Sequence, residues 1–148
     1  MRTVFGRRFA LACAALLVAS LVSLAAHEKK AAGAFELVIG WADEPAFAGS
    51  RNAVVVTVAD QKGPVQDTAG SLSVEIAFGS KRMTLPLEPV FNRPGEFRAW
   101  LVPTRAGTYT FRVTGKLRNQ LIDVTSRCAD NTFHCVEDSS VIQFPVKD

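Results

Sequence analysis

The sequence is poor in the residues that enzymes most often use for catalysis. It has two histidines, three cysteines and one tyrosine among 148 residues. It contains no G-x-S-x-G turn, no phosphate-binding glycine loop and no H-E-x-x-H motif. Neighbouring carboxylates such as Asp43 and Glu44 would point to opposite faces of a strand, so we interpret them as solvated loop charges. We therefore expect a protein that is not an enzyme.

Acidic residues are absent from residues 1–26, which have the layout of a secretory signal peptide. Three arginines precede an uncharged stretch of 18 residues, 9–26, that closes with Ala25 and Ala26. Cleavage after Ala25 fits the small-residue rule better, whereas cleavage after Ala26 would make His27 the first residue. The alternative is an uncleaved anchor. The apolar stretch is long for a signal peptide and only slightly shorter than the roughly 20 residues of a spanning helix.

The mature chain lacks an excess of charge of either sign. Three of the 17 basic residues lie in the leader, which leaves 14 basic against 14 acidic residues. A neutral, exported domain gives no reason to expect nucleic acid as a partner. We expect the protein in the periplasm, in the cell envelope or outside the cell, and at a membrane only if the leader is retained.

A free thiol is not expected after export. Cys13 lies in the leader, so Cys128 and Cys135 remain as an even pair within CADNTFHC. Disulfides persist in exported proteins, and the sequence lacks the C-x-x-C spacing and second ligand pair of a zinc or redox site. The sequence therefore predicts a Cys128–Cys135 disulfide.

Helical periodicity is also missing after residue 30. Apolar residues instead alternate with polar ones in short runs that Gly, Pro, Asn or Asp separate, at 34–41, 52–60, 71–79, 81–90, 96–104, 107–117, 120–128 and 141–148. This pattern predicts an all-β, immunoglobulin-like antiparallel sandwich of about seven or eight strands. We predict three segments: a signal-peptide helix at 1–26, a flexible arm at 27–33 and the sandwich domain at 34–148.

One short stretch sharpens the fold prediction. TRAGTYTFRV, residues 104–113, is similar to the corner of immunoglobulin-like domains, where a tyrosine near the start of a strand bonds to nearby backbone. Tyr109 would be that residue, with Phe111 where antibody domains have their second core cysteine. The alternative is that Tyr109 is an ordinary strand residue.

Both histidines are candidate metal ligands. His27 lies at or beside the predicted new amino terminus, where its imidazole and the α-amine could chelate one ion. His134 lies in the predicted disulfide loop, and Asp130, Glu137 or Asp138 could add an oxygen ligand. Nitrogen donors of this kind suit copper(II). The alternative is that His27 is a tail residue and His134 an exposed loop residue.

The leader that ends in Ala-His, with GWADEPAFAGSRNAVVVTV at 40–58 and PGEFRAWLVPTRAGTYTFRV at 94–113, resembles small exported bacterial immunoglobulin-like proteins. These include periplasmic copper-resistance carriers and related accessory proteins. The resemblance implies a non-enzymatic binding or accessory module, copper(II) as its metal and His27 as the amino-terminal ligand. Unlike the carriers, this chain has no second histidine soon after His27 and no methionine-rich loop. The alternative is a metal-free adhesion or assembly module; both imply a protein partner in the cell envelope.

Overall fold

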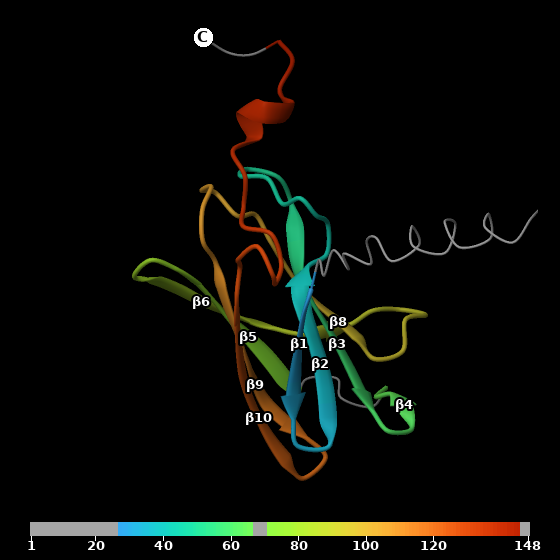
Figure 1. Ribbon diagram of the computed structural model, residues 1–148. Helices are drawn as coiled ribbons and strands as arrows, with labels where there is room; N and C mark the ends of the chain where they lie inside the picture. Colours follow the sequence, from blue (N-terminus) through green and yellow to red (C-terminus); the bar gives the residue numbers. More distant parts are fainter. Residues whose placement is uncertain (1–26, 67–70, 146–148) are drawn as a thin grey trace, which may run out of the picture.

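Two antiparallel sheets pack face to face and confirm the predicted all-β sandwich (Figure 1). The computed structural model describes residues 27–66 and 71–145, so the predicted signal peptide lies outside the described residues. The strands are β1 (Glu28–Ala32), β2 (Phe35–Trp41), β3 (Asn52–Asp60), β4 (Gly63–Pro64), β5 (Leu72–Phe78), β6 (Lys81–Pro86), β7 (Glu88–Pro89), β8 (Glu96–Leu101), β9 (Thr110–Leu117) and β10 (Gln120–Arg127). A 3₁₀ helix, η1 (Ser139–Ile142), follows them.

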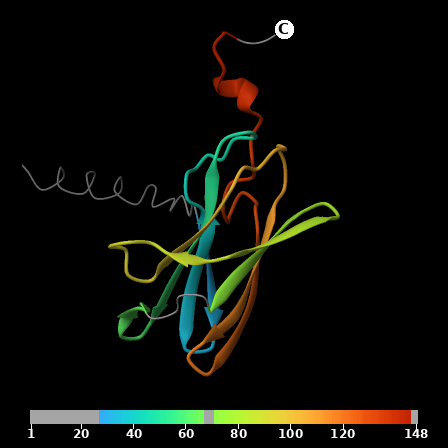
Figure 2. The ribbon, with the colours of Figure 1, turned by 180° about the vertical axis from the view of Figure 1, so that it is seen from behind.

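The first sheet has six strands and the second has four. The first runs in the order β1-β2-β3-β8-β7, with β4 beside β3, and the second in the order β10-β9-β5-β6. At one side of the sandwich the two sheets meet through β1 and β10 (Figure 2). There the Ser126 hydroxyl donates to the Glu28 carboxylate, and the Gln120 amide donates to the Ala32 carbonyl.

The core forms where the apolar faces of the two sheets meet. Alternating residues of the central strands are almost completely buried, among them Leu37, Ile39, Val54, Val56, Val74, Phe97, Phe111 and Val113. Because successive strand residues point to opposite faces, this alternation sends one set inwards and leaves the other at the surface. Trp41 lies edge-on to both Tyr109 and Phe111, with ring centroids 5.6 and 4.9 Å apart.

The predicted tyrosine corner is present. The Tyr109 hydroxyl donates a hydrogen bond to the Arg105 carbonyl at 3.1 Å, while the ring packs in the core. Phe111, two residues on, is fully buried where an antibody domain would have a core cysteine. Ring packing therefore replaces the disulfide of antibody domains at this position.

Replacing Tyr109 with phenylalanine should lower the free energy of unfolding by about 1 kcal/mol, because the hydroxyl loses its backbone partner while the ring stays packed. Thermal or denaturant unfolding of the two proteins measures this difference. An unchanged stability would mean that the hydroxyl bond contributes nothing to the fold.

The prediction of a flexible arm at 27–33 is wrong. Residues 28–32, predicted as part of a flexible arm, form β1, which pairs along its whole length with β2. Gly33, with a φ of +58°, makes the tight turn between them that a residue with a side chain rarely adopts. Two-residue strands β4 and β7 also raise the strand count above the predicted seven or eight.

Residues 141–145, the described part of the strand predicted at 141–148, do not form a strand. The first two of them belong to η1, whose first turn is capped by the Asp138 carboxylate accepting from the Ser140 amide at 2.8 Å. Val141 and Ile142 within η1 and Phe144 after it, which suggested a strand, are exposed rather than packed. Among the described residues, no helix is both long enough and apolar enough to cross a membrane.

Candidate functional site

Three segments that are far apart in the sequence meet at one end of the sandwich. They are the start of β1, the loop 42–51 between β2 and β3, and the segment 128–138 after β10 (Figure 1). Each carries one of the side chains considered below: His27, Glu44 and His134. The fold therefore brings the two predicted metal-ligand histidines to the same end of the domain.

Asn52 holds the start of the loop that carries Glu44. Its side-chain amide donates to the Asp43 carbonyl at 2.8 Å, and its side-chain oxygen accepts from the Asp43 amide at 3.1 Å. Asn52 is buried, with 3% of its surface exposed, so these bonds are shielded from water. The residue next to Glu44 is thereby fixed on both sides of its backbone.

Backbone hydrogen bonds join this loop to the segment that follows the disulfide. The Glu137 amide donates to the Ala46 carbonyl at 2.8 Å, and the Ala48 amide donates to the Glu137 carbonyl at 2.9 Å. Val136 exchanges two further backbone bonds with Gly107. These contacts explain why Glu44 and His134 come together although they are far apart in the sequence.

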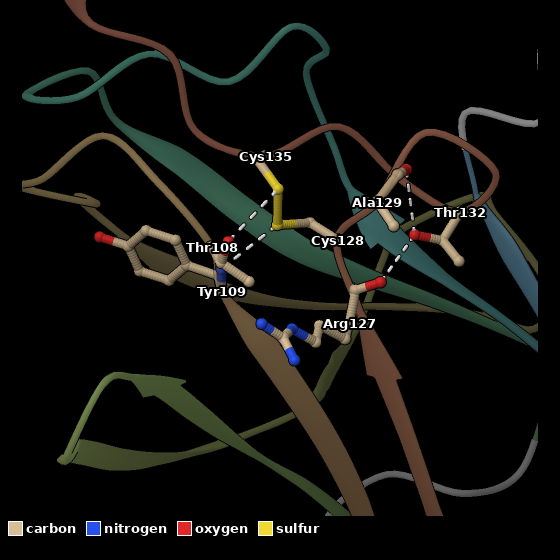
Figure 3. The surroundings of a disulfide bond; sticks show 7 residues. All are labelled: Thr108, Tyr109, Arg127, Cys128, Ala129, Thr132 and Cys135. Carbon is tan, nitrogen blue, oxygen red and sulfur yellow. Dashed lines mark hydrogen bonds between the residues drawn. A yellow bond between two sulfur atoms is a disulfide. The ribbon is translucent and has the colours of Figure 1, made fainter.

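The predicted disulfide between Cys128 and Cys135 is present (Figure 3). It closes a loop of seven residue steps in which the Thr132 hydroxyl donates to the Arg127 carbonyl at 2.6 Å. The Tyr109 amide lies 3.3 Å from the Cys128 sulfur, so the loop sits directly on the tyrosine corner. The disulfide and these bonds hold the loop in one shape.

Phe133 anchors the same loop in the core. Its ring is fully buried and stacks on Phe111, with centroids 4.7 Å apart and planes 7° apart. The next residue, His134, has a side chain that is 51% exposed. An inward phenylalanine followed by an outward histidine fixes where the imidazole lies on the surface.

Glu44 is the residue on which both histidines act. Its side chain is only 9% exposed, and its Oε2 lies 3.1 Å from His134 Nδ1. Apart from this contact with the His134 ring, no side chain of the described residues donates a hydrogen bond to either carboxylate oxygen. Burial raises the pKa of Glu44, whereas the charges of His27 and His134 and the backbone at Trp41 and His134 act to lower it. The interpretation of Glu44 as a solvated loop charge is therefore wrong.

His27 approaches the site from the start of β1. Its Nε2 lies 3.0 Å from the Trp41 carbonyl, at the end of the neighbouring strand β2. The pairing of β1 with β2 sets this position, since Glu28 lies opposite Ile39. His27 is therefore held against the domain by its ring and is not a free tail residue.

The acidic residues suggested beside His134 have other surroundings. Asp138 caps η1 with its side chain. Asp130 and Glu137 are exposed, and no side-chain hydrogen bond or ion pair links either of them to the rest of the described chain. The carboxylate that faces His134 is Glu44, which the sequence marked only as one half of an acidic pair.

The site has ligand types that a transition metal accepts, but they are not arranged as a completed metal site. Within residues 27–66 and 71–145, no group of three or more His, Cys, Asp or Glu side chains is positioned to hold an ion. The His27 ring is engaged with a carbonyl, so it would have to turn to join Glu44 and His134 around one ion. Two imidazoles and a carboxylate are donors that suit Cu(II) and Zn(II).

Comparisons with known proteins add little to this geometry. No protein-family model matches the sequence, and no curated protein is significantly similar to it. Among solved structures, the chain matches an engineered protein with 28% identity and a TM-score of 0.44. That match covers 63% of this chain and 20% of the engineered one.

Proposed function

We propose that this protein is an exported, non-enzymatic accessory module of the cell envelope that binds Cu(II) through His27, Glu44 and His134. The observation that carries the proposal is the buried Glu44 carboxylate, which lies 3.1 Å from the His134 ring at the end of the sandwich that also carries His27. A buried carboxylate is costly unless it is paired, hydrogen-bonded or bound to a metal. A cation between the three side chains would meet that need.

The predicted processing site adds to this proposal. Cleavage after Ala26 would place the α-amine on His27 itself, beside the imidazole, as a fourth donor. Cleavage after Ala25 would move the amine one residue away. Intact mass and amino-terminal sequencing of the exported protein distinguish these two products from a chain that keeps its leader.

Copper titration tests the site directly. Cu(II) should bind the exported protein in a one-to-one ratio, and Glu44→Gln, His27→Ala and His134→Ala should each weaken binding by roughly tenfold or more, about 1.4 kcal/mol. Calorimetry measures the affinity, and electron paramagnetic resonance reports nitrogen ligands. Glu137→Gln is the matched control, since it removes an exposed carboxylate near the same loop. Binding that survives all three site variants would place copper elsewhere.

A second candidate is a metal-free module that binds a protein in the cell envelope. The exposed C-terminal segment favours it, because Val141, Ile142 and Phe144 are 66%, 60% and 98% exposed. In this case the exported protein would not bind Cu(II), and His27→Ala would have no effect on its interactions. The titration described above therefore separates the two candidates.

A further inference from the structure

The outer face of the four-stranded sheet contains a hollow that shares no residue with the copper proposal. Its volume is about 500 Å³, within the range of small-molecule pockets. Residues of β5, β6, β9 and β10 line it, and Thr108 lines it from just before β9. Phe78, at the end of β5, is among the lining residues. None of its lining residues is His27, Glu44 or His134.

Strand register explains why the face is hollow at this point. Ala77 pairs with Arg82 on one side and Thr110 on the other, and Thr110 pairs in turn with Arg127. Residues directly opposite one another share a face, so these four form one row across the sheet. The row has long arginines at its two ends and short side chains between them. With strands about 4.8 Å apart, the arginine backbones are roughly 14 Å apart across three spacings.

Of the three arginines that line this hollow, Arg127 is the one whose positive charge has no acidic partner among the described residues, and Glu75 also lines the hollow. Arg112, in the next row, is neutralised by Asp123, with its two guanidinium contacts at 2.6 and 2.8 Å. Arg82 donates to the Gly79 carbonyl at 2.8 Å and lies 3.7 Å from Glu75. The Arg127 guanidinium has neither a hydrogen bond nor an ion pair within the described part of the chain, and in Figure 3 it extends from β10 towards β9.

The rest of the lining suits a hydroxylated ligand. Thr108, Thr110 and Thr125 supply hydroxyl groups that can both donate and accept. Phe78 supplies an aromatic ring that is held in place by Tyr109, with centroids 4.9 Å apart. A guanidinium binds a carboxylate through two parallel hydrogen bonds, while hydroxyls and a ring face suit a sugar.

We propose that this hollow binds an acidic sugar, with the sugar carboxylate on the unpaired Arg127 and the sugar ring over Ala77 and Thr110. The ligand is a uronate unit, presented by a polysaccharide outside the cell or as a free oligosaccharide. This site is independent of the copper proposal, because the two share no residue. A saccharide site on an exported protein would give the module a fixed attachment point in its surroundings.

The test is a titration of the isotope-labelled exported protein with tetragalacturonate, followed by nuclear magnetic resonance. Signals of Thr110, Thr125 and Arg127 should shift in a saturable manner, and maltotetraose, a neutral sugar, should leave them in place. Arg127→Gln should weaken binding at least tenfold. Ala77→Leu should do the same by filling the floor of the hollow without removing charge. Unfolding curves and unperturbed spectra of both variants verify that they fold.

Lys116→Gln is the charge-matched control. Lys116 is an even number of residues from Thr110 on β9, so it lies on the same outer face of the sheet. It does not line the hollow, so its loss should not change the affinity. Equal weakening by Lys116→Gln and Arg127→Gln would overturn the proposal, because it would indicate attraction by net charge alone. Saturation by sulfate with no response to tetragalacturonate would also overturn it. Glu44→Gln should retain sugar binding, so failure of the copper site and failure of this site are distinguishable.

Discussion

Truncating Phe133 to alanine should lower the free energy of unfolding by about 3–5 kcal/mol, which is the cost typical of removing a buried phenylalanine ring. The ring is fully buried and stacked on Phe111, which in turn lies edge-on to Trp41. Loss of the ring leaves a cavity at the end of the core that the loop cannot fill, because its two ends are joined by the disulfide. Chemical denaturation of wild type and variant measures the effect.

Phe144→Ala is the control for this prediction. It makes the same chemical change at a ring that is 98% exposed, so stability should change by less than about 0.5 kcal/mol. Phe133→Ala should also weaken Cu(II) binding under conditions where the variant is folded, because Phe133 positions His134. A small loss of stability, similar to that of Phe144→Ala, would show that the loop does not depend on this ring.

Removing the disulfide should cost about 2–3 kcal/mol. The bond joins cysteines only seven positions apart, and the stabilisation from closing so short a loop is at the lower end of the usual range. We expect the domain to stay folded, since the Thr132 hydroxyl bond, the backbone bonds of Val136 and Glu137 and the Phe133 ring still hold the segment. The lost constraint would act mainly on the position of His134.

Two measurements examine this prediction. A double variant, with both cysteines replaced by alanine, should melt lower than wild type, and a reductant should lower the melting temperature of wild type but not that of the double variant. Thiol labelling of the native protein should find no free thiol at Cys128 or Cys135. Labelling of both cysteines without reductant would mean that the bond does not form in the exported protein.

The features that depend on short stretches of sequence were predictable. Alternation of apolar and polar residues is itself the geometry of a half-buried strand, so runs such as 52–60 and 71–79 indicated the sandwich directly. TRAGTYTFRV identified the tyrosine corner, because the hydroxyl of Tyr109 reaches a carbonyl only four residues away. The rarity of cysteine and the predicted export identified the Cys128–Cys135 pair.

Elements whose stability comes from a distant partner were not predictable. EKKAA at 28–32 has no β-branched residue, yet it is a strand because β2 offers it an open edge. VIQF at 141–144 has strand-forming residues, yet no described strand pairs with it, and its apolar side chains are exposed. Local preference was overridden in both places by the presence or absence of a partner.

The same distinction, between local sequence and distant partners, applies to the candidate sites. By itself, the sequence determined the sandwich, the disulfide and the tyrosine corner, because each depends on local pattern or on the rarity of a residue type. His27 and His134 as metal ligands stay a prediction. Only the tertiary structure decided that Glu44 is buried beside His134, since backbone hydrogen bonds join the loop that carries Glu44 to the segment around Glu137. The row from Arg82 to Arg127 likewise exists only through strand register, which places residues from three separate parts of the sequence side by side.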